Sequence, residues 1–369
     1  MRPHVAPLSR AAQQGIALIV VMISIFVLSM LAGGFAYSMK VETKLARNGN
    51  SEEELQWLGR SGVEYARWIL AQQMMIAQEP YDGLDQVWAG GPGGIGTSNS
   101  PLADVQKEVP LADGSFTWEI KDLERKWNVN AMLAPGGDTI LQNAFAPMNM
   151  DAGDVTPVVN SILDWMDGGK RIQGADAAEY ERLNPPYSAK NGPIDDISEL
   201  LLVKGVTDLM YWGTSSPDHP ISTFIPPQNR SHMPDVIPDF KGLVDLFTAV
   251  SDGKININTA PVEVLQMIPN ITPEAAQAIV SGREGLDDGS GLTGPYRNLG
   301  QVSRMPEITP EMGRIIAQYG DVRSRTFQVN VTATVNGYTR YFTAILGRNN
   351  PRDVQVLSFY WSDPEDQKH

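Results

Sequence analysis

The sequence of 369 residues contains no cysteine and has four histidines. Without cysteine the chain has no disulfide, no thiol nucleophile and no cysteine-ligated zinc, so a hydrophobic core must hold the fold together. The histidines stand at positions 4, 219, 232 and 369, a spacing that suits neither a metal site nor a catalytic triad. Ser61 lacks the strand-turn-helix context of a nucleophile elbow. The sequence therefore predicts a protein that is not an enzyme.

Clusters of basic side chains are missing as well. The chain has 29 Lys and Arg against 43 Asp and Glu, which gives a formal net charge of −14. Nucleic-acid binding depends on grouped Lys and Arg that displace counterions from phosphates. The acidic balance keeps the protein in solution and argues against a nucleic-acid partner.

No charged side chain occurs between Ala11 and Met39. As a helix, the apolar run from Ile16 to Phe35 would cover about 30 Å, the thickness of a bilayer's hydrocarbon core. Arg2 and Arg10 precede this run, which favours a cytoplasmic N-terminus and a body on the other side of the membrane. A removable signal peptide is the alternative, but its apolar region typically has ~7–15 residues. We therefore expect a single retained membrane span.

Helix-forming residues continue beyond the span. The segment Asn48-Gly-Asn-Ser51 predicts an interruption or kink, with Ser51 as an N-cap before three glutamates. The helix then resumes and ends near Gln78, before Glu79-Pro80. Apolar residues at helical spacing predict one buried face, made of Leu55, Leu58, Val63, Ala66, Ile69 and Leu70.

The sequence Gln13-Gln14-Gly15, placed before an apolar helix that becomes amphipathic, resembles the prepilin-peptidase site of type IV pilins and type II secretion pseudopilins. The resemblance implies cleavage between Gly15 and Ile16, followed by methylation of the new N-terminus. Most such subunits carry glutamate at the fifth mature position, where this chain has Val20. A buried carboxylate there would need a neighbour's ammonium group. Its absence is typical of the K-type minor pseudopilin family of type II secretion systems.

Strands are predicted on both sides of a long helical region. Residues 114–121 alternate apolar and polar side chains. Residues 326–335 and 338–346 flank Asn336-Gly337, a strong hairpin signal, and one more strand follows at 354–361. These strands are expected to pack on the N-terminal helix. The predicted class is α+β: a pseudopilin fold with a large inserted α-helical domain.

A repeat in the insertion predicts helix-hairpin-helix-like (SAM-like) units. Met267-Ile-Pro-Asn-Ile-Thr-Pro and Arg304-Met-Pro-Glu-Ile-Thr-Pro align, and residues 202–207 form a degenerate third copy. Each copy places threonine at the N-cap of a new helix. Related modules in DNA-uptake proteins hold phosphates with a glycine-bearing turn. Here the turn Pro269-Asn-Ile-Thr272 has other residues at both glycine positions, and in the second copy Glu307 puts a carboxylate where a phosphate would come. We therefore interpret the repeats as structural.

An ordered series of short elements carries the strongest likeness to the K-type family: Asp164-Trp-Met-Asp167, Gly174-Ala-Asp176, Tyr180, Pro185-Pro-Tyr187 and Glu199-Leu200. The resemblance implies a calcium site, for which Asp164, Asp167, Asp176 and Glu179 are the candidate ligands. Calcium takes ~6–8 oxygen ligands, but this chain has Gly169 and Ala177 where the family usually has further acids, and Lys170-Arg171 enters the loop. Helix capping and salt bridging are the alternative role for these acids.

We expect the following organisation: a leader at 1–15, an N-terminal helix at 16–78 with its membrane span at 16–36, a sheet domain made of 79–129 and 321–361, an inserted helical domain at 130–320, and a tail at 362–369. The resemblance implies a minor pseudopilin in the bacterial inner membrane that caps or initiates a periplasmic pseudopilus. Its implied partners are I- and J-type minor pseudopilins, prepilin peptidase and the inner-membrane secretion platform. The alternatives are a minor pilin of a type IV pilus and a membrane-tethered DNA-binding protein for DNA uptake.

Overall fold

One helix dominates the computed structural model. The structure describes residues 10–94, 96–148, 150–214, 239–285, 293–364 and 367, with side chains of α1 described outside 10–16 and 45–50. Helix α1 (Arg10–Met75) is continuous over 66 residues. The expected interruption with an N-cap at Ser51 is therefore wrong, as is the expected end at Gln78. Poor helix formers such as Asn and Gly cost at most about 1 kcal/mol each, and a break would require a new helix nucleus.

The remaining elements follow in chain order and alternate short helices with strands. The helices are η1 (Val87–Ala89), η2 (Thr97–Asn99), η3 (Pro101–Asp104), η4 (Val129–Leu133), α2 (Gly137–Phe145), η5 (Ala146–Met148), α3 (Ala152–Asp167), α4 (Ala177–Tyr180), η6 (Ile197–Leu202), α5 (Asp208–Trp212), α7 (Leu243–Leu246), α8 (Val262–Gln266), α9 (Pro273–Glu284), α10 (Leu299–Val302) and α11 (Pro310–Tyr319). The strands are β1 (Glu108–Leu111), β2 (Gly114–Asp122), β3 (Trp127–Asn128), β4 (Phe247–Thr248), β5 (Ile255–Asn256), β6 (Gly320–Asp321), β7 (Thr326–Val335), β8 (Tyr338–Asn350) and β9 (Asp353–Trp361).

The main sheet has five antiparallel strands in the order β1-β2-β7-β8-β9. The predicted hairpin is confirmed: Val335 pairs with Tyr338, and Asn336 and Gly337 both have positive φ, at 51° and 82°. This is the backbone that a two-residue hairpin turn of the Asn-Gly type requires. Strand β1 was not expected, because its four residues have no alternating pattern.

Helix α1 lies against one face of this sheet. The six predicted apolar residues of its inner face are all buried, with exposed fractions from 0% to 5%. Two glycines let the helix come close to the strands: a Cβ at Gly59 would meet the Phe342 ring at 2.5 Å, and one at Gly62 would meet Val331 at 2.5 Å. The sheet contributes fully buried residues such as Phe327. Helix and sheet thus share one core.

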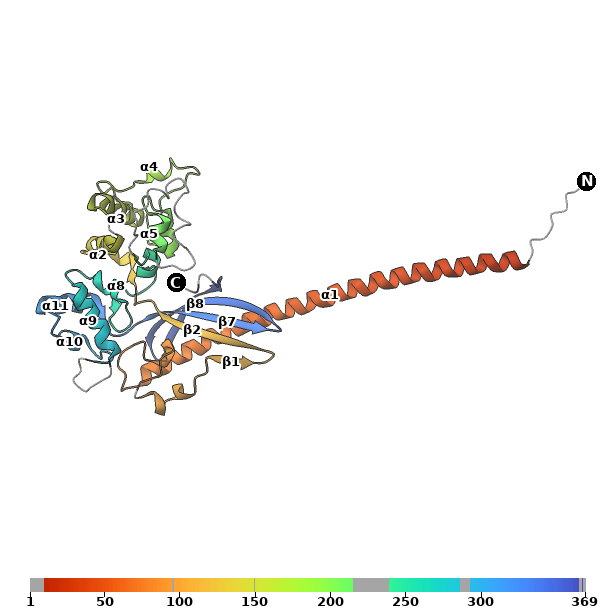
Figure 1. Cartoon of the computed structure of the whole chain (residues 1–369), viewed down its shortest axis with the longest axis horizontal. Coiled ribbons are helices and arrows are strands. Elements are labelled where there is room, and N and C mark those ends of the chain that lie inside the picture. Colours follow the sequence, from red (N-terminus) through yellow and green to blue (C-terminus); the bar gives the residue numbers. More distant parts are fainter. Residues whose placement is uncertain are drawn as a thin grey trace, which may run out of the picture.

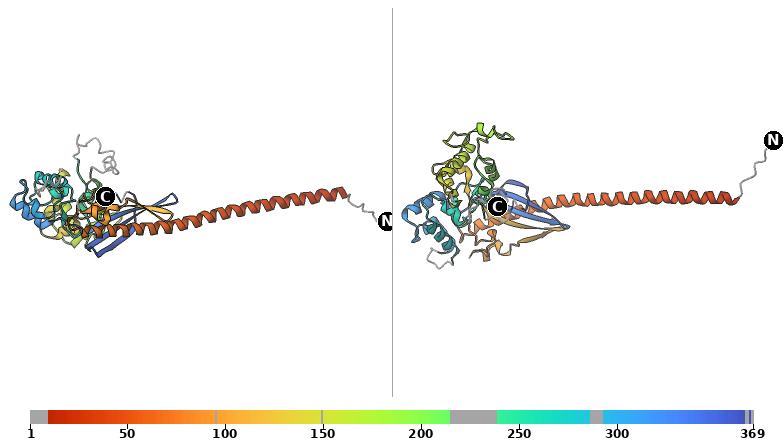
Figure 2. Two further views of the ribbon diagram at one scale, coloured as in Figure 1. Left: turned by 90° about the horizontal axis from the view of Figure 1, so that it is seen from below. Right: turned by 45° about the horizontal axis from the view of Figure 1, so that its top comes forward.

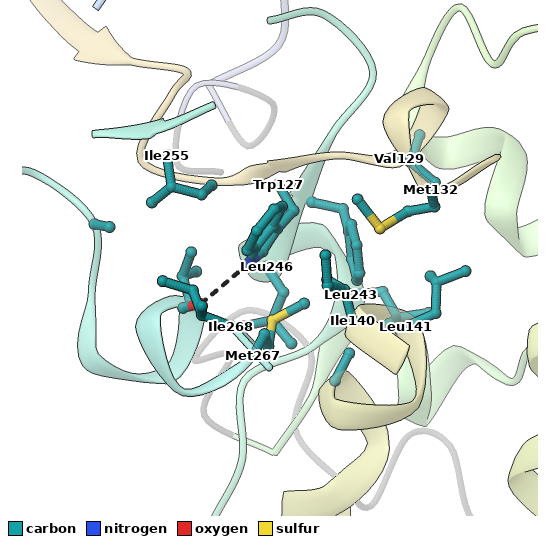
Figure 3. Close-up of a cluster of buried hydrophobic side chains, with 14 of the residues drawn as sticks. Trp127, Val129, Met132, Ile140, Leu141, Leu243, Leu246, Ile255, Met267 and Ile268 are labelled. Carbon is teal, nitrogen blue, oxygen red and sulfur yellow. Dashed lines mark hydrogen bonds between the residues drawn. The ribbon is translucent and has the colours of Figure 1, made fainter. Parts of the chain in front are cut away.

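The segment between β2 and β7 has a second core of its own. At its centre Trp127 is 1% exposed, and its indole Nε1 donates to the carbonyl of Val264 at 3.1 Å (Figure 3). Apolar residues from η4, α2, α7, α8 and neighbouring turns surround this ring (Figure 3). Short parallel pairs, β3 with β4 and β5 with β6, join distant parts of the segment. These pairs were not expected, since two-residue strands leave no periodic signal.

The inserted segment lies at the end of the molecule opposite the N-terminus. In Figure 1 the N-terminal half of α1 projects alone, the sheet covers its C-terminal half, and α2 to α11 lie beyond the sheet. Both further views agree (Figure 2). The fold is thus the α+β arrangement predicted from the sequence, with a helical segment inserted at its far end. The boundaries expected for the individual domains stay predictions.

Candidate functional site on the long helix, the acidic loop and the domain junction

The first half of α1 is exposed along its apolar length. The stretch Ala17–Lys44 has 28 residues, its most apolar part has a mean hydropathy of 2.6, and no part of it is buried inside the molecule. As a helix it is about 42 Å long, more than the ~30 Å of a hydrocarbon core. Val20 lies within it and is 56% exposed. By length and composition this stretch suits a membrane span.

The predicted cleavage site lies in the first turns of the same helix. Gly15 and Ile16 belong to α1, but their side chains lie outside the described residues, as do residues 1–9. Cleavage between them stays a prediction.

The second half of α1 carries large apolar side chains on the face turned away from the sheet. Trp57, Trp68 and Met75 are 65%, 36% and 64% exposed, and their spacing places them on one side of a helix. The Arg60 guanidinium lies 5.4 Å from the Trp57 ring, and Tyr65 stacks on Trp68 at 5.6 Å. We call Trp57, Trp68 and Met75 the outer stripe. Sequence patterns did not single it out, because a tryptophan at helical spacing is usually a core residue.

The acidic loop follows α3 and brings together two of the four predicted calcium ligands. Arg171 Nη1 lies 2.7 Å from Asp164 Oδ1, and Arg171 Nη2 lies 2.7 Å from Asp167 Oδ2. The pKa of Asp167 is lowered, mainly by its hydrogen bonds from Arg171 and further by the hydrogen bond from the Gly169 N–H. These two carboxylates therefore face a guanidinium group.

The other two predicted ligands lie in different surroundings. Glu179 forms an ion pair with Lys204, and Asp176 is the N-terminal flanking residue of α4 with no side-chain capping bond. Over the described part of the chain, no three His, Cys, Asp or Glu side chains are grouped so that they could hold a metal ion. The four acids are therefore not grouped around one position, because Arg171 lies between the first two and supplies the positive charge there. The calcium site expected from them stays a prediction.

The motif series that resembled the K-type family converges on one aromatic cluster. Trp165 meets Tyr180 edge-on at 5.1 Å, and Tyr180 lies 5.5 Å from Tyr187. The Tyr187 hydroxyl donates to the carbonyl of Leu202 at 2.7 Å, and Leu200 is 1% exposed. The spaced motifs thus describe one packed unit around α3 and α4.

A buried polar network joins the insertion to the sheet. The Asn256 side chain donates to Asp122 Oδ2 at 3.1 Å and to Ser324 Oγ at 2.7 Å, while Ser324 Oγ donates to Asp122 at 2.6 Å. Asn256 Oδ1 also accepts from the N–H of Asn258 at 2.9 Å, a turn-forming bond that is typical of asparagine. The three side chains are 0–2% exposed. Only the fold brings them together, since they come from separate segments.

Glu124 extends this network. Its carboxylate accepts from the backbone N–H groups of Arg325 at 2.9 Å and Thr326 at 3.0 Å. The pKa of Glu124 is raised to about 8. Burial is the largest cause of this shift, and the negative charge of Asp122 is the second. Two buried carboxylates thus lie two residues apart at the junction between sheet and insertion.

The raised pKa predicts a pH-dependent stability. Because folding raises the pKa of Glu124 from 4.5 to about 8, the folded chain binds more protons than the unfolded chain between these values. The contribution of Glu124 to the free energy of unfolding should therefore be greatest below about pH 4.5. It should fall as the pH rises to about 8, by at most about 1.4 kcal/mol per pH unit. Urea unfolding at pH 5, 6, 7 and 8 measures this slope. Glu124→Gln should flatten it, and an equal slope in the variant would contradict the assignment.

The helix-hairpin-helix repeats are confirmed as a structural pattern. The hydroxyls of Thr207, Thr272 and Thr309 accept from the backbone N–H three residues further on, at 3.3, 3.2 and 3.3 Å. Asn270 has a φ of 62°, so asparagine takes the left-handed position that glycine usually fills. Gly205, with a φ of 91°, takes the same position in the degenerate copy, whereas the turns that contain Asn270 and Glu307 have no glycine to form a cradle for a phosphate.

Of the residues considered for catalysis, Ser61 lies within the part of the chain that the structure describes. The Ser61 hydroxyl donates to the Trp57 carbonyl at 2.9 Å within α1, an ordinary helical bond and not a strained turn. The four histidines lie outside the described residues.

Two family profiles match the insertion. Both are described as type II secretion system (T2SS), protein K, and they cover residues 125–212 and 255–316. The first contains the acidic loop and its aromatic cluster, and the second contains the helix-hairpin-helix repeat.

Relatives with curated descriptions extend the likeness over the chain. Type II secretion system protein K of Pseudomonas aeruginosa is 22% identical over 364 residues, which cover 95% of this chain and 93% of that protein. A protein K of Aeromonas hydrophila is 23% identical over 54% of this chain and 61% of its own length. A putative protein K of Escherichia coli K12 is 23% identical over 54% of this chain and 60% of its own length.

A solved structure shares the fold. The match is to the crystal structure of the GspK-GspI-GspJ complex from the type 2 secretion system of enterotoxigenic Escherichia coli, with a TM-score of 0.62 and 18% identity over 86% of this chain and 99% of that chain. None of these matches favours a type IV pilin or a DNA-uptake protein. The fold, the two profiles and the nearly full-length relative agree in pointing to the type II secretion system protein K family, the minor pseudopilins.

Proposed function

We propose that this minor pseudopilin occupies the tip of the periplasmic pseudopilus. The observation that carries the proposal is the position of the insertion, which lies beyond the sheet at the end opposite the N-terminal part of α1 (Figure 1). In a fibre whose subunits stack along their N-terminal helices, this bulk leaves no room for a subunit above. Val20 supports the same position, since a subunit with no neighbour above it needs no carboxylate there.

The orientation follows from charge. Arg2 and Arg10 precede the apolar stretch, so the N-terminus faces the cytoplasm and the sheet and insertion lie in the periplasm of the inner membrane. In this position Gly15 and Ile16 meet prepilin peptidase at the cytoplasmic side, and the anchored subunit meets the secretion platform.

The outer stripe supplies the contact with other subunits. Its apolar side chains lie on the free face of the same helix that spans the membrane, and exposed tryptophans commonly contribute much of the binding energy of an interface. The protein of similar fold was crystallised with GspI and GspJ. The partners that we propose are accordingly I- and J-type minor pseudopilins.

The tip position can be tested with a single label, because the chain has no native cysteine. Glu181 is exposed in the insertion, so Glu181→Cys offers one site for a maleimide-gold particle. Isolated pseudopili should then carry label at one end of each fibre. Gold distributed along the fibres would contradict the tip assignment, and the unlabelled parent chain controls for unspecific gold.

The role of the outer stripe gives a second test. Replacing Trp57 and Trp68 together by alanine should weaken binding to detergent-solubilised I- and J-type pseudopilins by about 30-fold or more, as expected when interface tryptophans are truncated. Trp361→Ala is the matched control, because Trp361 is 56% exposed on β9. Affinity measured by biolayer interferometry should change little in this control. If the stripe variant binds like the parent chain, α1 docks through another face.

A further inference from the structure

The loop after α3 is folded around one carboxylate. Helix α3 ends at Asp167, and Gly168, with a φ of 66°, turns the chain back across the last turn of the helix. Asp164, on that last turn, is 2% exposed. A buried carboxylate is stable in the ionised form only if a positive charge and hydrogen-bond donors compensate for the lost water.

Arg171 provides both. Its backbone N–H lies 3.2 and 3.1 Å from the two Asp164 oxygens, and its Nη1 donates to Asp164 Oδ1 at 2.7 Å. The same guanidinium group donates to Asp167 through Nη1 at 2.9 Å and Nη2 at 2.7 Å. One arginine thus bridges two carboxylates of α3, with the planar two-pronged geometry that suits this pair.

Two glycines leave the room that this bridge needs. A Cβ at Gly174 would meet Asp164 Oδ2 at 2.0 Å, and one at Gly169 would meet Arg171 Nη1 at 2.7 Å and Asp164 Oδ1 at 2.8 Å. The Gly174 N–H donates to the Arg171 carbonyl at 3.0 Å, and Asn160 Nδ2 donates to the carbonyl of Ile172 at 2.8 Å. The backbone of the loop is therefore shaped to hold the guanidinium group at this position.

We infer that the Arg171 guanidinium is the resident cation of the α3–α4 loop, so the loop keeps its fold without a divalent metal ion. Asp164 and Asp167, two of the four carboxylates that resemble calcium ligands, already hydrogen-bond to this guanidinium group, and Glu179 forms an ion pair with Lys204. This inference concerns the insertion alone and holds whether or not the subunit lies at a fibre tip.

Amide hydrogen exchange of the full-length chain in detergent micelles tests the inference locally. Peptides covering residues 160–180 should exchange at the same rate in EDTA and in millimolar calcium. Arg171→Gln should speed their exchange by about tenfold or more, because it leaves a buried carboxylate without its counter-ion. Arg182→Gln is the matched control, since Arg182 is an exposed arginine beside the same loop. Slower exchange of the parent chain in calcium than in EDTA would overturn the inference.

A second substitution tests the charge pairing between Asp164 and Arg171 directly. Asp164→Asn should speed exchange in the parent chain, where it removes a partner of Arg171. In the Arg171→Gln background the same substitution should slow exchange, because it replaces an unpaired buried charge with a neutral amide. If Arg171→Gln alone does not fold, the double variant of Arg171→Gln and Asp164→Asn still tests the inference, because it has no unpaired buried charge. An effect of the same sign in both backgrounds, or Arg171→Gln that exchanges like the parent chain, would overturn the inference.

Discussion

Gly15→Val is expected to leave the subunit uncleaved and to stop secretion. The resemblance to prepilin-peptidase sites places the cut after Gly15, and glycine lets the peptidase approach the backbone without a side chain in the way. An uncleaved chain keeps Arg2 and Arg10 in front of its membrane helix. These charges would have to enter the bilayer before α1 could leave the membrane for the fibre, which is costly.

N-terminal sequencing and a secretion assay measure the effect. The parent chain should begin at Ile16, whereas Gly15→Val should keep its leader and lose secretion completely. Gly34→Val is the control within the same apolar helix, because a Cβ at Gly34 has nothing within 4 Å. It should be cleaved normally. An uncleaved Gly15→Val chain that still supports secretion would refute the need for processing.

Arg348→Met is expected to destabilise the protein by about 3–5 kcal/mol, the usual cost of leaving one partner of a buried ion pair alone. Arg348 is 2% exposed and its guanidinium pairs with Asp82, which is equally buried. It also donates to the carbonyl of Ser324 at 2.8 Å and lies 4.6 Å from the Phe327 ring. Arg348 thus ties the loop after α1 to the strand β8 and the approach to β7.

Chemical denaturation of the full-length chain measures this loss. Arg352→Met, at an exposed arginine in the β8–β9 turn, is the matched control and should change the free energy of unfolding little, as surface substitutions generally do. Adding Asp82→Asn to Arg348→Met should recover part of the loss, because it removes the unpaired buried charge. If the double variant is no more stable than Arg348→Met, the pair with Asp82 is not the source of the effect.

Elements with strong local periodicity were predictable. The buried face of α1, the Asn336-Gly337 hairpin and the threonine caps of the repeats are set by residues close to one another in sequence. Their hydrogen bonds and packing follow from the backbone geometry of single elements. The strand predicted at 114–121 was likewise found, as part of β2.

The failures have a different cause. The expected break at Ser51 overrated local propensity, because a few poor helix formers cost less than the new helix nucleus that a break would require. The calcium ligands implied by the family resemblance stay a prediction, and the sequence could not show that Arg171 faces Asp164, because this depends on how the loop folds back. Asp82, Asp122, Asn256, Ser324 and Arg348 come from distant segments, so their buried network left no spacing in the sequence.

The sequence alone determined an apolar membrane helix, the strands that pack on it, the repeat in the insertion and the resemblance to the K-type family. These features rest on composition and short-range periodicity. Tertiary structure decided that the insertion lies at the end opposite the membrane helix, that Arg171 fills the acidic loop, and that the outer stripe is left exposed. Each of these depends on contacts between segments far apart in the chain, where burial and charge pairing, rather than local propensity, set the arrangement.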